Sequence, residues 1–239
     1  MKKILLFIAL LVSAHILFAQ KKDWSKIDLS NRPGDHLMIQ LSTDYWTGAP
    51  DSIKNHIGGL SRGGNIYFMI DKPFKSNPRL SIAFGAGVGT SNIYFKKMSV
   101  DIKATGSVVP FRVLDTTDRF KKYKLTTAYL EAPIELRFTA DPLKYNKSIK
   151  AAIGVKVGTL LNAHTKGKTL ENKDGRTINA YTLKESKKNF FNNTRLAVTA
   201  RLGYGNFSLF GAYQIGGIFK DGTAPDIKPL QVGISLSGL

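Results

Sequence analysis

The sequence contains no cysteine among its 239 residues. Disulfide bonds, thiolate metal sites and lipid attachment at a cysteine are therefore excluded. Acidic residues are scarce as well, with 17 Asp and Glu against 35 Lys and Arg, which gives a formal net charge of +18. This charge predicts an anionic partner. Because the basic residues are scattered through connecting segments and an export signal precedes them, we expect no nucleic acid among the partners.

Long hydrophobic runs are also missing after the first twenty residues, so no later segment approaches the ~20 apolar residues of a transmembrane helix. The N-terminal segment has Lys2 and Lys3, an apolar stretch from Ile4 to Val12, and Ala19 before Gln20. This pattern predicts a cleaved signal peptide over residues 1–19 and a single mature domain over residues 20–239. A retained membrane anchor is the alternative.

The mature chain alternates between apolar and polar or small residues with a period of two, which is typical of strands with one apolar face. Leu130, Ile134 and Leu136, for example, alternate with Glu131 and Glu135. Eight segments follow this pattern, over residues 37–44, 65–71, 80–89, 129–138, 149–158, 195–203, 207–215 and 230–237. Each is long enough to cross a bilayer at a tilt.

The connections between these segments alternate between short and long. Short turns cover residues 72–78, 141–147 and 205–206, whereas longer segments cover residues 47–59, 96–123, 165–189 and 220–226. This asymmetry indicates an all-β fold, an eight-stranded antiparallel up-and-down transmembrane β-barrel with its long loops outside the cell. A soluble periplasmic ligand-binding barrel is the main rival, because such barrels also have period-two strands.

The face opposite the apolar one favours the membrane barrel, because it carries mostly Gly, Ala and Ser with charges of both signs. A narrow lumen needs small residues and paired charges. We expect carboxylates to meet cations there; the residues are Asp44, Glu131, Glu135, Arg137, Lys150, Lys156, Arg195 and Arg201. Aromatic residues near strand ends predict interfacial girdles. These are Tyr45, Trp46, Tyr94, Phe95, Phe190, Phe191 and Phe219 at the long loops, and Phe74, Phe138, Tyr145, Tyr204 and Phe207 at the short turns.

Two segments and the signal carry a family resemblance. Residues 129–138 (YLEAPIELRF), residues 201–213 (RLGYGNFSLFGAY) and the signal ending Phe18-Ala19-Gln20 resemble the outer-membrane β-barrel family of Bacteroidetes, often called the PorT family. The resemblance covers most of the mature chain. It implies an eight-stranded barrel in the bacterial cell outer membrane, and an accessory role in protein secretion with secretion-system proteins as partners.

No motif in the sequence indicates an enzyme. Residues 85–89 (GAGVG) lack the third glycine and the following helix of a dinucleotide-binding loop. His36, His56 and His164 have neither the spacing of metal ligands nor a paired serine. We therefore expect no catalytic, cofactor-binding or metal-binding residues, no cofactor and no enzymatic activity.

The two longest connections are rich in basic residues. These are Lys96, Lys97, Lys103, Arg112, Arg119, Lys121, Lys122 and Lys124 in the first, and Lys166, Lys168, Lys173, Arg176, Lys184, Lys187 and Lys188 in the second. Outside the cell they would meet outer-membrane lipid and form charge-assisted hydrogen bonds with lipopolysaccharide phosphates; a solvated surface is the alternative. Since side chains fill an eight-stranded barrel, we expect a structural or interaction protein, with a small porin-like transport pore as an alternative.

Overall fold

The computed structural model describes residues 36–58 and 60–238. The expected signal peptide, residues 1–19, and the start of the domain expected over residues 20–239 lie outside the described residues. The long strands are β1 Leu37–Thr47, β2 Arg62–Pro73, β3 Leu80–Phe95, β6 Arg119–Thr139, β7 Ile149–Glu171, β9 Thr194–Tyr204, β10 Phe207–Gln214 and β11 Lys228–Ser237. The smaller elements are helix α2 Asp51–Lys54, strands β4 Met98–Val100, β5 Phe111–Val113 and β8 Thr177–Ser186, and the 3-10 segment η2 Pro142–Lys147.

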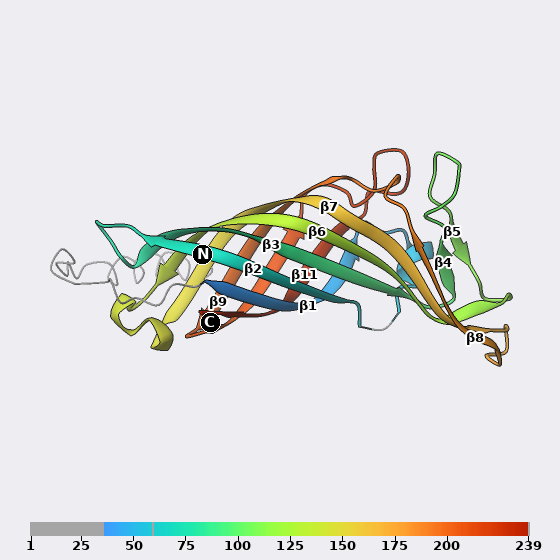
Figure 1. Cartoon of the computed structure of the whole chain (residues 1–239), viewed down its shortest axis with the longest axis horizontal. Helices are drawn as coiled ribbons and strands as arrows, with labels where there is room; N and C mark the ends of the chain where they lie inside the picture. Colours follow the sequence, from blue (N-terminus) through green and yellow to red (C-terminus); the bar gives the residue numbers. More distant parts are fainter. Residues whose placement is uncertain (1–35, 59, 239) are drawn as a thin grey trace, which may run out of the picture.

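The eight long strands form a closed antiparallel barrel (Figure 1). Each strand pairs with its neighbour in the order β6-β3-β2-β1-β11-β10-β9-β7, and β6 also pairs with β7, so the eight strands form a continuous ring. All eight segments with period two are strands of this barrel, so the predicted fold class is confirmed.

The two faces of the barrel wall divide as the alternation predicts. On β6, the side chain of Ile134 is outward and 50% exposed, whereas Glu131, Glu135 and Arg137 are buried inside. Exposed aliphatic side chains continue around the wall, including Leu41, Ile66, Phe68, Ile153, Leu202, Leu209 and Ile234. This belt has the composition of a surface that faces lipid. Within residues 36–58 and 60–238, no helix is both long and apolar enough to span a bilayer.

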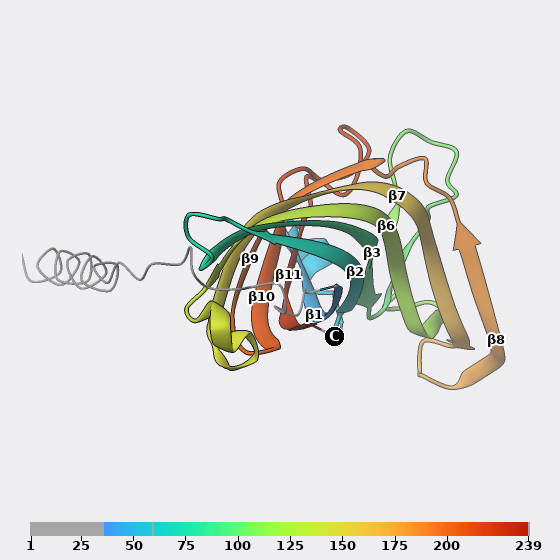
Figure 2. The same ribbon diagram turned by 60° about the vertical axis from the view of Figure 1, so that its left-hand side comes forward.

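Two of the connections predicted as loops contain strands that extend outside the membrane. β6 has 21 residues and β7 has 23, about twice the length that crosses a bilayer. Their register shifts between Ala128 and Tyr129, and such a bulge bends a strand pair. Beyond it, residues 119–127 of β6, residues 162–171 of β7 and all of β8 form what we call the external sheet, with β8 at its edge (Figure 2).

Several aromatics predicted for the outer girdle lie inside instead. Trp46, Phe95, Phe190, Phe191 and Phe219 are at most 6% exposed. They pack with Ile93, Met98, Ile102, Leu125 and Leu160 into an apolar cluster at the long-loop end, which we call the cap. The girdle prediction is also wrong for Tyr145, which is buried. Side chains that do face outward are Tyr45, Phe74, Tyr204 and Phe207. The cap forms because β4, β5 and α2 fold over the mouth and exclude water from these rings.

Candidate functional site

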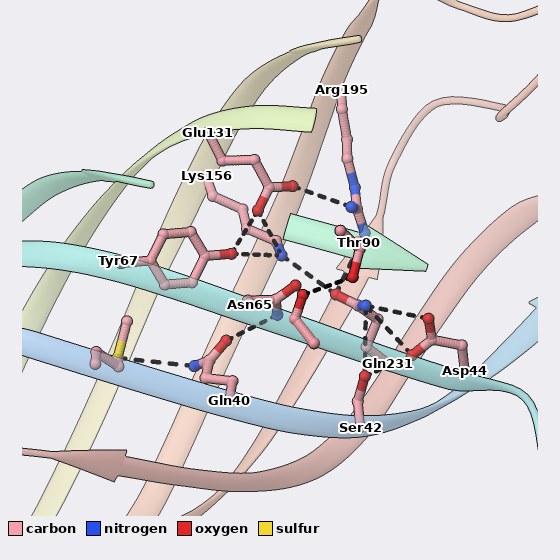
Figure 3. Close-up of polar contacts among 12 residues, drawn as sticks. Gln40, Ser42, Asp44, Asn65, Tyr67, Thr90, Glu131, Lys156, Arg195 and Gln231 are labelled. Carbon is pink, nitrogen blue, oxygen red and sulfur yellow. Dashed lines mark hydrogen bonds and ion pairs between the residues drawn. The ribbon is translucent and has the colours of Figure 1, made fainter. Parts of the chain in front are cut away.

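A buried polar network crosses the lumen at mid-height, centred on Glu131 of β6 (Figure 3). The Glu131 carboxylate accepts hydrogen bonds from Arg195 Nη1 at 3.0 Å, Lys156 Nζ at 3.2 Å and the Tyr67 hydroxyl. These four side chains come from β6, β9, β7 and β2, so the network joins opposite walls of the barrel. The predicted meeting of Glu131 with Arg195 and Lys156 is confirmed.

Gln231 of β11 links this centre to a second carboxylate on β1. Its Oε1 accepts from Lys156 Nζ at 3.3 Å and from Arg195 Nη2 at 3.4 Å, and its Nε2 donates to Asp44 at 3.2 Å. Ser42 Oγ also donates to Asp44, at 2.5 Å. We predicted that Asp44 meets a cation, but among the described residues no cation lies within ion-pair distance of it. The amide of Gln231 is its hydrogen-bond partner instead.

A second ionic layer lies nearer the short-turn end. Glu135 accepts from Arg201 Nη2 at 2.7 Å and from Arg137 Nε at 2.9 Å, and Arg137 lies 3.9 Å from Asp71. Lys150, another predicted partner, places its Nζ 3.3 Å from the centre of the Tyr145 ring. The carboxylates of Glu135 and Asp71 thus lie beside the guanidinium groups of Arg137 and Arg201, which offsets the cost of burying these charges.

Glycines on the same lumen face leave space for these carboxylates. A Cβ at Gly158 would lie 2.9 Å from Cγ of Glu131, and one at Gly89 would lie 2.5 Å from its Oε2. The predicted role of the glycines at residues 85–89 as small lumen-facing residues is confirmed, because they lie in β3 and not in a nucleotide-binding loop.

The lumen is therefore filled at three heights, by the lower ionic layer, the Glu131 network and the cap. Lys156 and Glu131 are each 2% exposed, and Phe191 in the cap is fully buried. Every charge in the centre is hydrogen-bonded to another side chain of the barrel. This arrangement joins the walls of the barrel to one another through buried side chains.

A second candidate site lies on the outward face of the external sheet. Strand register places Lys124, Lys166 and Lys184 side by side on β6, β7 and β8, and places Lys122 opposite Lys168 in the next row. We call these five lysines the basic rows. They occupy alternate positions of their strands, so all five side chains share one face. Sequence reasoning found the lysines but predicted loops, so it could not place them together.

The charge of this face alters the pKa of two of its groups. Partial burial, and then repulsion by Lys184, Lys124 and Lys166, lowers the pKa of His164, which lies in the adjoining row. Partial burial and Lys166 likewise lower the pKa of Lys124. In both cases the cause after burial is repulsion by neighbouring lysines, so positive charges lie close together on this face.

The other predicted candidates are dispersed. His36 stacks on Phe68, and His56 lies 2.8 Å from the carbonyl oxygen of Ser52. Within the described residues, no group of three or more His, Asp or Glu is placed to hold a metal ion. The remaining basic residues of the two long connections do not join the basic rows; Lys97, for example, pairs with Asp115 at 3.5 Å.

A closed eight-stranded barrel with an aliphatic outer belt and an ionic interior defines a membrane-spanning barrel of the outer-membrane type. The chain belongs to the outer membrane protein beta-barrel domain family, whose model matches residues 19–219. This membership places the protein in the outer membrane and confirms the broad family that the sequence resembles. The narrower PorT and Bacteroidetes assignment stays a prediction.

Solved structures of one bacterial protein show a weak likeness. The chain is similar to Ail, the attachment invasion locus protein of Yersinia pestis, at 12% identity over 84% of this chain and 94% of that chain, with a TM-score of 0.36. A structure of Ail in complex with the heparin analogue sucrose octasulfate matches at 13% identity, the same coverage and a TM-score of 0.35. No curated protein matches. TM-scores this low do not support a fold assignment, so the fold is assigned from the strand pairing described above.

Proposed function

We propose that this protein is a sealed, non-conducting outer-membrane barrel that anchors the external sheet at the cell surface and binds partners there. The filled lumen is the observation that carries this proposal. Hydrogen-bonded side chains bridge the barrel walls at mid-height; these are Tyr67, Glu131, Lys156, Arg195 and Gln231. The cap closes the outer mouth. With transport blocked, the part of the molecule available for interaction is what projects from the membrane.

Outer-membrane lipid is the partner that we propose, through the phosphates of lipopolysaccharide at the basic connections. The formal net charge of +18 supports this, because charge-assisted bonds from lysine to phosphate are roughly twice as strong as neutral ones. No catalytic activity is part of the proposal. An accessory role in protein secretion rests on the family resemblance alone and stays a prediction; its test is the secreted protein profile of a strain that lacks this chain.

Conductance across planar bilayers tests the sealed barrel. The purified full chain is expected to give no channel events at protein amounts at which an open porin gives many. Discrete conductance steps that scale with protein concentration would refute the sealed lumen and favour the porin-like alternative. Recovery of the folded chain in a periplasmic extract made without detergent would instead favour a soluble ligand-binding barrel.

A further inference from the structure

The five lysines of the basic rows lie opposite one another on neighbouring strands, without carboxylates between them. Directly opposed residues on neighbouring antiparallel strands have Cβ atoms about 5 Å apart, and like charges at such positions are destabilising. Here Lys166 of β7 faces Lys124 on one side and Lys184 on the other, with Lys122 and Lys168 opposed in the next row. The sheet therefore concentrates positive charge against its own stability.

The opposite face of the same sheet shows the contrast. There Lys121 pairs with Glu171 at 3.1 Å. On the face of the basic rows, the neighbouring residues in register are Tyr94, Thr182 and His164, and none of the five lysines forms an ion pair with any residue that the structure describes. The positive charge of this face could therefore be neutralised by an anion from outside the chain.

The position of the basic rows indicates where that charge comes from. They lie on the outward face, the face that carries Leu130 and Val157 of the aliphatic belt lower on the same strands. From Leu130 to Lys124 is about 20 Å along β6, and less in height because the strand is tilted. A molecule that packs against the belt with its acyl chains thus has its head group beside the basic rows.

The surface between the two rows is hollowed. The hollow, of about 130 Å³, is lined by Tyr94, Lys122, Tyr123, Lys124, Lys166 and Lys168. The Lys124 ammonium is held in place, because it donates to Asn92 Oδ1 at 2.6 Å and lies 5.8 Å from the centre of the Tyr94 ring. Exposed lysines around a fixed one can close on an anion from several sides, and tyrosine is enriched at membrane interfaces.

We propose that the basic rows bind the phosphate groups of glycolipids in the outer leaflet, lipids whose acyl chains pack against the wall of β6 and β7. This inference rests on the proposed function and deepens it, since it names the site among the many basic residues and the lipid layer that supplies the anion. Lys122, Lys166, Lys168 and Lys184 contact the phosphate from three strands, and Lys124 sits at the base of the hollow.

The test measures binding of fluorescently labelled rough lipopolysaccharide to the full chain in neutral detergent micelles. One variant replaces the exposed lysines of the rows and leaves Lys124, with its hydrogen bond, in place; its substitutions are Lys122→Gln, Lys166→Gln, Lys168→Gln and Lys184→Gln. The matched control loses the same charge at exposed positions outside the two basic connections, through Lys54→Gln, Lys75→Gln, Lys144→Gln and Lys220→Gln. A heat-modifiability gel confirms that both variants are folded.

We expect the row variant to bind lipopolysaccharide at least about tenfold more weakly, since each lysine near an anionic lipid surface contributes substantially, and the control to stay within about twofold. Dephosphorylated lipopolysaccharide should bind the wild type as weakly as the row variant binds the intact lipid. Inorganic phosphate at the same concentration should not compete, because it has no acyl chains to dock on the belt.

Equal binding by the row variant and the control would overturn the proposal, and so would competition by inorganic phosphate at equal concentration, which would indicate a site for soluble anions. Channel activity of the wild type would overturn the proposal of a sealed lumen. It would not affect the binding comparison between the row variant and the control, because that comparison does not depend on conductance. Loss of lipid binding in the row variant of a silent barrel would support both.

Discussion

Replacing Glu131 with glutamine tests whether the lumen network holds the barrel together. The carboxylate is 2% exposed and lies within 3.2 Å of Lys156 Nζ and 3.0 Å of Arg195 Nη1. Glu131→Gln keeps the shape of the side chain but leaves two buried cations facing a neutral amide. Breaking a buried ion pair from one side costs about 3–5 kcal/mol. We expect Glu131→Gln to lower the free energy of unfolding by about 3 kcal/mol, because the amide oxygen that replaces the carboxylate still accepts one hydrogen bond.

The measurement is urea unfolding of the full chain in lipid vesicles, followed by tryptophan fluorescence and by the fraction of heat-modifiable protein on a gel. Glu185→Gln, on the edge strand β8, removes the same charge from a more exposed site and should change stability by less than about 0.5 kcal/mol. Adding Lys156→Met to Glu131→Gln should recover part of the loss, because it removes one of the two orphaned cations. Equal stability of Glu131→Gln and Glu185→Gln would refute the reasoning, since it would mean that the lumen charges are solvated.

Three further changes test the cap, the wall and the basic face. Phe191→Ala, at a fully buried position, should lower stability by about 3–5 kcal/mol in the same urea assay; a smaller loss than at an exposed phenylalanine would count against a packed cap. Gly87→Val should prevent formation of heat-modifiable barrel, because a Cβ there would overlap the backbone of β2, whereas Gly64→Ala has its nearest neighbour 3.9 Å away and should fold. Lipopolysaccharide binding should strengthen as the pH falls below the lowered pKa of His164, because protonation adds a positive charge to the basic face; a His164→Asn variant should lose this pH dependence.

Much of the barrel could be predicted from the sequence because a single physical rule governs it. Wherever one face of a strand meets lipid and the other meets the lumen, apolar residues must alternate with small or charged ones. Glu131, Glu135 and Arg137 could be assigned to the lumen in this way, and their partners on other strands followed from the need to neutralise buried charge. The partner of Asp44 could not be predicted in this way. Its contact with the Gln231 amide depends on the register between β1 and β11, which the sequence alone does not determine.

The external sheet was missed because its buried face is only weakly apolar. Tyr123, Leu125 and Ala163 pack into the cap, but Thr127, Thr165 and Gly167 share that face, so the contrast in hydrophobicity along residues 119–127 and 162–171 is small. The aromatics of the cap were misplaced for another reason. Trp46 has the same parity as Asp44, and Phe95 the same parity as the lumen-facing glycines of β3, so continuing the alternation through the strand ends would have pointed them inward.

The contact between Asp44 and Gln231 has a consequence for how the protein is made. The two residues are separated by 187 positions and belong to the strands β1 and β11, whose pairing completes the ring. Lys156 and Arg195 also donate to the amide oxygen of Gln231, so these two hydrogen bonds form only when that strand arrives. Long-range pairing of this kind is slow. We therefore expect the nascent chain to reach its membrane with Asp44 still hydrated, and to exchange that water for the Gln231 amide only when its first and last strands meet.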